Sequence, residues 1–531
     1  MTRITCLLSA ALAAAAPPAA AAAQQPRYDL LITGGTVVDG TGSPRLAADV
    51  AVRGDRIVAV SRSPLAPADA ARVVDASGLV VAPGFIDLHA HLEPLLDMPD
   101  AESHVRQGVT TALGGPDGSS PWPIGPYLDS AQALGLGLNV GVLVGHNTIR
   151  SRVMRTAARA PTTDELQRMR AMVAQAMGEG AFGLSTGLAY VPGTYSRTDE
   201  VVALSRVAGD SGGIYTSHMR DEASGLLASV AETMEIGRLA RLPVIITHHK
   251  AAGRPQWGLS VRTLAMVDSA RRAGAEVWLD QYPYTGTQTG ISYLVPAWAL
   301  ADGDSAFARR AADPVLRDSI LRGIVHQIRV ERGFEDLRFV QFANVSWSPT
   351  LQGRTLQDWA VERGLAPTPE TGAELVVDAV LRGGARVVYH VLDEADVQRI
   401  MRHPAAMIAS DGRLNRLGDG HPHPRAYGTF PRVLGRYARD LGVLTLEQAV
   451  HKMTGMPAAR LRLADRGRVA EGAAADLVVF DPATVADRGT FEAPHQWPQG
   501  IRWVVVNGVI ALEPAGPTGA RGGRALRRPR R

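Results

Sequence analysis

The stretch Leu79-Val80-Val81-Ala82-Pro83-Gly84-Phe85-Ile86-Asp87-Leu88-His89-Ala90-His91 decides how this chain is interpreted. Its apolar first half predicts a buried β-strand. Side chains alternate between the two faces of a strand, so His89 and His91 point the same way, and Asp87 shares their face. Two imidazoles at the end of a buried strand form half of a metal site, and Asp87 is placed to orient a histidine.

Strand-like apolar runs of the same kind recur along the chain, and most of them end in polar residues. They end at residues 89–91, 110–114, 142–146, 183–186, 214–218, 245–248, 277–280 and 407–411. Helical stretches separate these runs, and alternating β and α elements predict an α/β fold with a parallel sheet. Eight such units predict a closed (β/α)8 TIM barrel, whose chemistry lies at the carboxyl ends of its strands.

The two ends of the chain predict a second, smaller domain. Short alternating strands separated by Gly-rich turns occur in residues 24–82 and again in residues 461–515. We interpret them as one small composite β-sandwich domain, interrupted by the barrel of residues 83–460. Residues 301–388 are too many for an ordinary connection and predict an insertion over the barrel mouth.

The N-terminus has the pattern of a secretory signal peptide over residues 1–23. Arg3 precedes an apolar run, and Ala21-Ala22-Ala23 offers a cleavage site of small residues. The alternative is an uncleaved membrane anchor. The one cysteine, Cys6, lies in this segment, so the mature chain would contain no disulfide. We therefore expect a periplasmic or secreted protein.

The formal charge of +4 comes largely from the arginines that follow Pro517. Gly and Pro interrupt this segment, so residues 516–531 are predicted to be a disordered basic tail. Nothing else predicts a nucleic-acid partner, and no second long apolar run predicts a membrane span in the mature form. The oligomeric state is left open.

Further metal-ligand residues occur at the predicted strand ends. His218 ends one strand, His248 ends the next, and Asp411 ends the last. A single histidine in such a position is more often a hydrogen-bonded core residue. Ligand types at several strand ends of one barrel, however, predict a metal site, because those ends meet at one rim.

The combination of His89, His91, His218, His248 and Asp411 resembles the amidohydrolase superfamily. Several segments are also similar to its D-aminoacylase (N-acyl-D-amino-acid deacylase) family. They are Gly145-His146-Asn147, Gly183-Leu184-Ser185-Thr186-Gly187-Leu188, Ser217-His218-Met219-Arg220, Thr247-His248-His249-Lys250, Tyr282-Pro283-Tyr284 and His423-Pro424-Arg425-Ala426-Tyr427-Gly428-Thr429-Phe430-Pro431. The resemblance covers essentially the whole mature chain, including the split β domain.

The resemblance implies a zinc-dependent hydrolase of N-acyl bonds, with one or two ions and another divalent metal as the alternative. His89 and His91 would hold one metal with Asp411 nearby, and His218 and His248 would hold the other. The family usually has a cysteine ligand in a Gly-Asn-Cys-Gly segment, whereas this chain has Gly115-Pro116-Asp117-Gly118. Asp117 is the positional substitute, since a carboxylate can coordinate or bridge zinc. It is also an ordinary turn residue between Pro and Gly.

Related cyclic-amide hydrolases bridge their metals with a carboxylated lysine, but no lysine precedes Lys250 in this sequence. The bridge is therefore Asp117 or is absent. We expect Asp411 to act as general base on water and then as general acid toward the leaving amine. His146 or His249 is a candidate to stabilise the tetrahedral intermediate.

The substrate of such an enzyme is a small N-acyl amino acid, whose free carboxylate needs a cationic partner. The resemblance links Lys250, Arg425 and Tyr284 to substrate binding, and His146 is a further candidate. Arginine suits bidentate recognition of a carboxylate. Trp278, with Tyr282 and Tyr284, is a candidate wall of the acyl pocket, although core packing explains Trp278 equally well.

The predicted function is metal-dependent cleavage of the amide bond of N-acyl-D-amino acids or related small N-acyl compounds. The first alternative is a cyclic-amide hydrolase of dihydroorotase or hydantoinase type, or a dipeptidase. The second is a non-catalytic periplasmic binding protein with a degenerate site. Acyl length and side-chain preference do not follow from the sequence, and D-selectivity enters through the resemblance alone.

Overall fold

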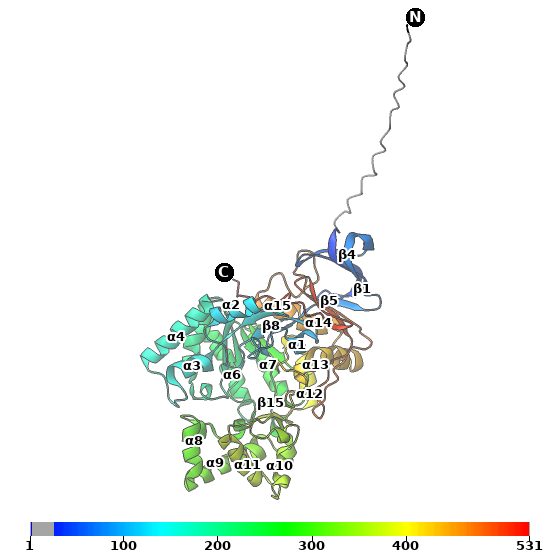
Figure 1. The fold of residues 1–531 in the computed structure, drawn as a ribbon. Helices are drawn as coiled ribbons and strands as arrows, with labels where there is room; N and C mark the ends of the chain where they lie inside the picture. Colours follow the sequence, from blue (N-terminus) through cyan, green and yellow to red (C-terminus); the bar gives the residue numbers. More distant parts are fainter. Residues whose placement is uncertain (1, 3–25, 530–531) are drawn as a thin grey trace.

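The computed structural model describes residue 2 and residues 26–529 of the chain. The predicted signal peptide falls outside these residues, apart from residue 2. The described chain forms a small β domain at one end, a central α/β part, and a helical insertion at the opposite end (Figure 1).

Both chain ends build the small β domain, in one nine-stranded sheet of order β23-β22-β21-β20-β5-β1-β2-β3, with β4 also paired to β1. The N-terminal strands are β1 (Tyr28–Val37), β2 (Leu46–Arg53), β3 (Arg56–Ser61), β4 (Ala70–Asp75) and β5 (Val80–Pro83). The C-terminal strands are β20 (Leu477–Phe480), β21 (Ile501–Val506), β22 (Val509–Glu513) and β23 (Gly516–Pro517). The two halves join where β20 pairs antiparallel with β5, so the sheet is complete only when both ends are present.

The central part consists of short parallel strands in three sheets. Their orders are β6-β8-β9, β10-β11-β12-β13-β14-β18 and β19-β7. The strands are β6 (Phe85–Asp87), β7 (Ala90–His91), β8 (Val109–Gly114), β9 (Asn139–Val142), β10 (Val144–Gly145), β11 (Gly183–Gly187), β12 (Ile214–His218), β13 (Val244–Ile246), β14 (Val277–Gln281), β18 (Ala406–Ile408) and β19 (Gly412–Arg413). Every predicted strand end lies on or directly after one of them, so the predicted α/β fold with parallel strands is confirmed. The strands are almost wholly buried, as parallel strands with covered faces are.

Helices follow the strands and cover them on the outside (Figure 1). They are α1 (Glu102–Val105), α2 (Ile124–Leu134), α3 (His146–Met154), α4 (Thr163–Gly178), α5 (Thr198–Asp210), α6 (Leu226–Ala240), α7 (Ser260–Arg272), α12 (Glu394–Arg402), α13 (Arg425–Arg432), α14 (Leu446–Met453) and α15 (Gly455–Leu461). Local sequence sets their starts. In α4, for example, the Thr162 hydroxyl accepts a hydrogen bond from the Glu165 backbone while the Glu165 carboxylate accepts one from Thr162, which forms a capping box.

The insertion has its own hydrophobic core and is longer than predicted. Its strands β15 (Thr287–Gly290), β16 (Val340–Asn344) and β17 (Arg386–Tyr389) form an antiparallel sheet. Its helices are α8 (Asp304–Ala312), α9 (Pro314–His326), α10 (Leu356–Glu362) and α11 (Pro369–Leu381), grouped at the end of the molecule opposite the small β domain (Figure 1). Residues 291–392 supply most of this core, so the predicted bounds of 301–388 omit β15.

The prediction of a disordered tail is wrong for the described residues. Residues 523–526 run beside β9: the Val140 amide donates to the Arg524 carbonyl at 2.9 Å, and the Leu526 amide donates to the Val140 carbonyl at 2.7 Å. Arg524 also forms an ion pair with Asp55 at 2.7 Å. Composition indicated disorder, but backbone pairing to a strand edge does not depend on side-chain polarity.

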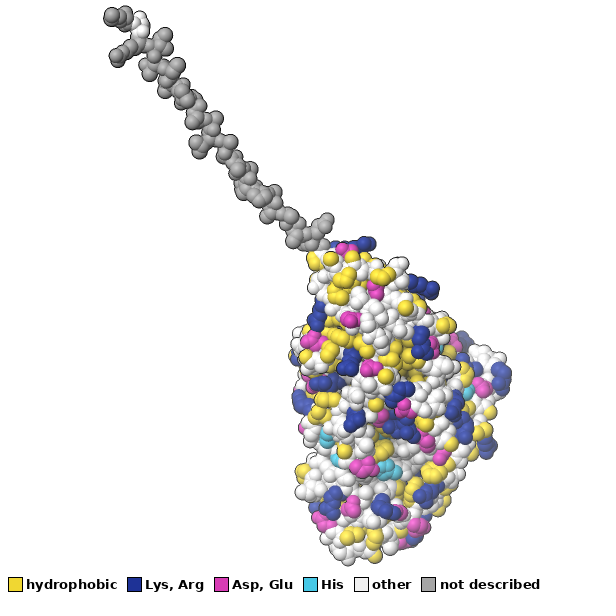
Figure 2. Space-filling view, turned by 90° about the vertical axis from the view of Figure 1, so that its right-hand side faces the viewer, with side chains coloured by type: hydrophobic (Ala, Val, Ile, Leu, Met, Phe, Trp, Pro, Cys, Tyr) yellow, Lys and Arg dark blue, Asp and Glu magenta, His cyan; other side chains and the backbone are white. Residues whose placement is uncertain are grey.

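Charged side chains of both signs are interspersed on the face shown in Figure 2, which agrees with 56 basic and 52 acidic residues in the chain. Among the described residues, no helix has both the length and the apolar character needed to cross a membrane.

Candidate metal centre

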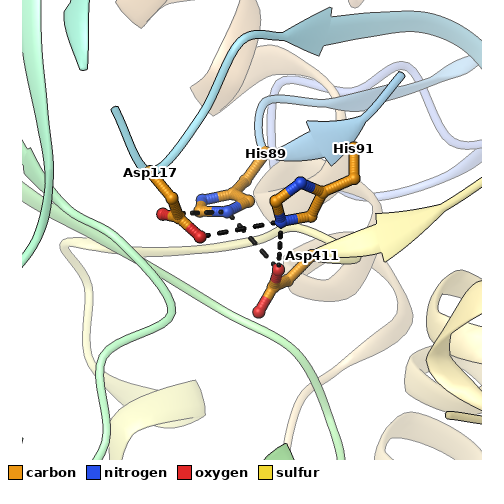
Figure 3. Close-up of side chains that lie close together, drawn as sticks. All are labelled: His89, His91, Asp117 and Asp411. Atoms are coloured by element: carbon orange, nitrogen blue, oxygen red, sulfur yellow. Dashed lines mark ion pairs between the residues drawn. The ribbon is translucent and has the colours of Figure 1, made fainter. Parts of the chain in front are cut away.

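Four ligand-type side chains from three strand ends point toward one another in Figure 3. His89 lies between β6 and β7, His91 ends β7, Asp117 follows β8, and Asp411 follows β18. The Asp411 Oδ1 atom lies 3.2 Å from His91 Nε2 and 3.5 Å from His89 Nε2. Asp117 faces the same two rings, with Oδ1 3.4 Å from His89 Nε2 and Oδ2 3.6 Å from His91 Nε2.

Asp117 also belongs to a second group, with His218 and His248. Its Oδ1 atom lies 3.4 Å from His248 Nε2, and its Oδ2 atom lies 3.8 Å from His218 Nδ1. The two imidazoles face each other, with 2.8 Å between His218 Nδ1 and His248 Nε2. One carboxylate therefore lies between two histidine pairs, and in each group the candidate ligand atoms all lie within 4.8 Å of one another.

The backbone is held in an uncommon conformation at three of these six residues. Asp117, His248 and Asp411 have φ values of +52°, +36° and +49°, in the left-handed region that non-glycine residues rarely adopt. Hydrogen bonds from strand neighbours hold two of them: the His248 amide donates to Asp280 Oδ1 at 2.6 Å, and the Asp411 amide donates to the His89 carbonyl at 2.9 Å. Such strain costs about 1–3 kcal/mol per residue and is concentrated at functional sites.

The polar atoms of this cluster lack protein partners in a way that fits a bound cation. Both ring nitrogens of His89, the Nε2 atom of His218 and the Oδ1 atom of Asp117 are buried and make no hydrogen bond within the described residues. Unsatisfied buried polar atoms are costly, and imidazole nitrogens with carboxylate oxygens are the donors that zinc accepts. The residues present therefore fit one or two divalent cations, with Asp117 shared.

Comparison with known proteins agrees with this geometry. Residues 72–266 and 295–512 match the amidohydrolase family. The chain is 40% identical to a D-aminoacylase of Alcaligenes xylosoxydans xylosoxydans over 94% of this chain and 98% of the relative. It is 39% identical to an N-acyl-D-glutamate deacylase of the same organism over 95% and 97% of the two chains.

The chain belongs to the amidohydrolase family.

Solved structures agree with the resemblance to the D-aminoacylase family, which is confirmed. A D-aminoacylase with a binuclear metal centre superposes with a TM-score of 0.81 at 38% identity and covers 94% of this chain and 100% of its own. An N-acyl-D-glutamate deacylase of Bordetella bronchiseptica, complexed with zinc and a phosphonate inhibitor, gives 0.81 at 37% identity over the same shares. A D-hydantoinase shares the fold at a TM-score of 0.55 and 15% identity.

Arg425 and Lys250, two predicted substrate-binding residues of this amidohydrolase, lie directly beside the metal centre. Arg425, at the start of α13, places Nη1 2.7 Å from Asp411 Oδ2, and its guanidinium lies over the Tyr282 ring at 4.6 Å. Burial raises the pKa of Asp411, but Arg425 and the histidines outweigh this effect and hold the pKa well below its usual value. Lys250 Nζ lies 2.6 Å from both Glu222 Oε1 and His248 Nδ1.

Two other predicted substrate-binding residues, His146 and Tyr284, contact side chains outside the metal centre. His146, in the first turn of α3, is buried, and its Nε2 atom is 2.8 Å from Glu200 Oε1. Tyr284 donates to Asp487 Oδ2 at 3.3 Å, away from the ligands, while Tyr282 lies against Arg425. Their assignment to substrate binding is therefore not supported by their contacts, because side-chain direction in a loop or a first helical turn depends on tertiary packing.

Two further candidates also face away from the centre. The Nε2 atom of His249 lies 2.8 Å from the Thr263 hydroxyl, so this nitrogen is directed away from the ligands, while its Nδ1 atom makes no hydrogen bond within the described residues. Trp278 lies between the guanidinium groups of Arg271 and Arg460, 4.0 and 3.9 Å from its ring, and is packed between helices rather than around an acyl group.

The sequence analysis missed two carboxylates that support the ligands. Asp280 accepts the His248 amide hydrogen bond, and its Oδ2 atom lies 4.0 Å from His89 Nδ1. Glu222 lies 3.1 Å from His248 Nδ1. The position of Asp280 at the end of a buried strand was a usable signal, whereas nothing in the sequence links Glu222 to His248.

Asp87, which we expected to orient a ligand histidine ring, contacts the backbone beside the ligands and lies 3.5 Å from the ring of His104, which belongs to neither ligand group. It accepts hydrogen bonds from the amides of His89 at 3.2 Å and Ser410 at 3.0 Å. Burial raises the pKa of this carboxyl to about 6. Asp87 thereby ties the first and last ligand-bearing strands together.

Proposed function

We propose that this protein is a metal-dependent hydrolase that cleaves the amide bond of N-acyl-D-amino acids or related small N-acyl compounds. The observation that carries the proposal is Asp117 between two histidine pairs, with Asp411 beside them, in a chain that belongs to the amidohydrolase family. The full-length similarity to a D-aminoacylase supports the substrate class.

The ligand roles follow from the two groups of side chains. His89, His91, Asp117 and Asp411 would hold one ion, and Asp117, His218 and His248 would hold a second, with Asp117 as the bridge. When bound there, zinc supplies Lewis-acid chemistry, because it lowers the pKa of water and polarises an acyl oxygen. Asp280 and Glu222 would fix the orientation of the ligands from outside the group.

Asp411 is the residue to which we assign proton transfer. Its Oδ1 atom faces the histidines and its Oδ2 atom faces Arg425, so the carboxylate is fixed between the metal site and the substrate side. It would accept the proton of the attacking water and then deliver it to the nitrogen of the leaving amine. The contact with Arg425 keeps Asp411 ionised before the reaction, as a proton acceptor must be.

The carboxylate of the substrate would bind to a group of buried donors beside Asp411. The Nε atom of Arg425 and the hydroxyl of Tyr282 are buried and make no hydrogen bond within the described residues. Lys250 adds a second positive charge, 5.9 Å from the Tyr282 ring. Tyr282 thus takes the role that the sequence analysis gave to Tyr284.

Two features of the architecture belong to the same proposal. The strands would close into a (β/α)8 barrel, which is supported by the pairing of β19 with β7 and by the hydrogen bond from Asp411 to His89. The pattern of residues 1–23 supports export to the periplasm or the medium.

The test is hydrolysis of paired N-acetyl-D- and N-acetyl-L-amino acids by samples of measured metal content. We expect zinc-dependent release of free amine from the D-series. Stoichiometric retention of ligand without turnover at saturating zinc would favour a binding protein. Turnover of dihydrouracil or hydantoin in place of N-acyl amino acids would favour the cyclic-amide alternative.

A further inference from the structure

A cavity with a volume of about 980 Å³ has Tyr190, a neighbour of the proposed ligand His218, in its wall. It lies between the start of α6 and the insertion, and its walls include Tyr190, Tyr293 and Arg332. None of the proposed ligands lines it. The proposed function leaves this cavity without a role.

Two tyrosines connect the cavity to the metal centre. The Tyr190 ring lies 4.4 Å from the His218 ring on one side and 6.0 Å from the Tyr293 ring on the other. Tyr293 in turn lies under the guanidinium of Arg332, 5.1 Å from its carbon atom. The two tyrosines therefore form a continuous series of contacts from the proposed ligand His218 to Arg332.

Arg332 is a buried cation with no counterion in the described part of the chain. Its exposed fraction is 4%, and its Nη1 atom makes no hydrogen bond to any described residue. No ion pair forms between its guanidinium and any residue of the described chain. Tyr293 covers one face of the guanidinium, which favours the charge and leaves the N–H groups at its edge available.

The other charged side chains of the cavity wall are already neutralised or hydrogen-bonded. Arg220 forms an ion pair with Glu232 at 2.9 Å. Asp221 accepts hydrogen bonds from the amides of Ala223 and Gly225 at the start of α6. Glu331 accepts hydrogen bonds from the amide and hydroxyl of Ser224.

We propose that Arg332 binds a second, distal carboxylate of the substrate, and that the enzyme prefers N-acyl amino acids carrying one. This inference rests on the proposed function and adds a specificity-determining residue to it. The distal carboxylate is on the amino-acid side chain or at the far end of the acyl group, depending on which arm enters the cavity. A buried guanidinium whose edge donors are free fits a carboxylate, because the pair can form two parallel charge-assisted hydrogen bonds.

The test compares two pairs of substrates that differ in charge but little in shape. The side-chain pair is N-acetyl-D-glutamate and N-acetyl-D-glutamine, and the acyl pair is N-glutaryl-D-leucine and N-pentanoyl-D-leucine. We expect the wild-type zinc enzyme to prefer the charged member of one pair, which identifies the arm. Arg332→Met should lower kcat/KM for that member about 10-fold or more, mainly through KM, with a much smaller effect on the neutral member.

Two further variants separate binding from folding. Arg332→Lys keeps the charge and should retain part of the preference. Arg254→Met removes a guanidinium that lies 4.3 Å over the Phe334 ring but outside the cavity, and it should leave the preference unchanged. Equal wild-type rates within both pairs, or an equal loss for charged and neutral substrates in Arg332→Met, would overturn the inference. Absence of turnover with all four substrates would instead contradict the proposed function.

Discussion

Two clusters of buried ionisable residues lie at neighbouring strand ends of this molecule, and they are built differently. In the first cluster, Glu200 accepts from His146 at 2.8 Å and from Arg150 at 2.5 Å, and Arg150 also donates to the Arg159 carbonyl at 2.6 Å. Its charges compensate one another inside the protein. In the metal centre, by contrast, two carboxylates and four histidines face one another, and several of their atoms make no hydrogen bond within residues 26–529.

The difference shows how a structural cluster can be distinguished from a functional one when residue types are the same. Both clusters contain a histidine and a carboxylate in the protein interior, and in both a histidine lies at a strand end of the β10-β11-β12-β13-β14-β18 sheet. Among the described residues, the metal centre leaves several ligand-type atoms without a protein partner and facing one another, whereas the Glu200 cluster leaves the Nε atom of Arg150. Buried groups of this kind require a compensating ligand, whereas the cluster around Glu200 requires none.

Removal of metal should have the largest effect on activity, and it should act on the metal centre and leave the Glu200 cluster intact. Treatment with a chelator should abolish hydrolysis of N-acetyl-D-amino acids, and zinc should restore it. Loss of a cation present at 100 times its Kd should also lower the free energy of unfolding by about 2.7 kcal/mol. Activity assays and thermal melts on chelated and reloaded samples check this, with mock-dialysed enzyme as the control. Full activity in chelated enzyme shown to contain almost no metal would refute the assignment.

Asp411→Asn should have the next largest effect. The amide is nearly isosteric but cannot accept the proton, so kcat should fall about 10²- to 10⁴-fold. Steady-state kinetics with metal analysis of the same sample tests the change. Glu200→Gln is the matched control, since it makes the same change from carboxylate to amide in the Glu200 cluster. It should leave kcat nearly unchanged. If Asp411→Asn turned over substrate normally with its metal intact, the proton-transfer role would be wrong.

Glu200→Gln should instead reduce stability. Loss of the carboxylate leaves the buried Arg150 guanidinium without its counterion, which typically costs about 3–5 kcal/mol. Denaturant unfolding followed by circular dichroism measures the change. The interpretation of this cluster as a self-compensating structural unit would fail if the variant unfolded at the wild-type midpoint.

The smallest expected effect is on how the stabilities of wild type and Glu200→Gln depend on pH. Burial raises the pKa of Glu200, but the opposing effect of His146 and Arg150 is larger, so the pKa lies below its ordinary value of 4.5. A carboxyl with a depressed folded-state pKa stabilises the protein above its unfolded-state pKa, and this contribution is lost as pH falls through the folded-state value. The stability difference between wild type and Glu200→Gln should therefore be constant near neutrality and shrink below about pH 4.5. A difference that grows on acidification would contradict this sign.

Most of the metal centre could be predicted from the sequence because strands impose strict geometry. Alternation along a strand places His89 and His91 on one face, and parallel strands bring their carboxyl ends to one edge. Asp117 could be identified because it occupies the position of a ligand in the family motif. Each of these inferences depends on backbone position alone.

The contacts that the sequence did not reveal depend on packing between distant segments. His146 follows a strand directly, but its side chain turns to Glu200, which lies on a helix 54 residues later. Glu222, which follows β12, contacts His248, which follows β13. Tyr284 contacts Asp487, which is 203 residues later in the sequence. The boundary of the insertion was missed for the same reason, since β15 is defined by its pairing with β17.

The pairing of residues 523–526 with β9 has a consequence for biosynthesis. β9 pairs with a segment that is translated about 385 residues later. This edge of the β6-β8-β9 sheet therefore stays open during synthesis until residues 523–526 have left the ribosome. A truncation after residue 520 would leave the backbone of residues 136–140 without this partner, in a protein that keeps all the proposed metal ligands.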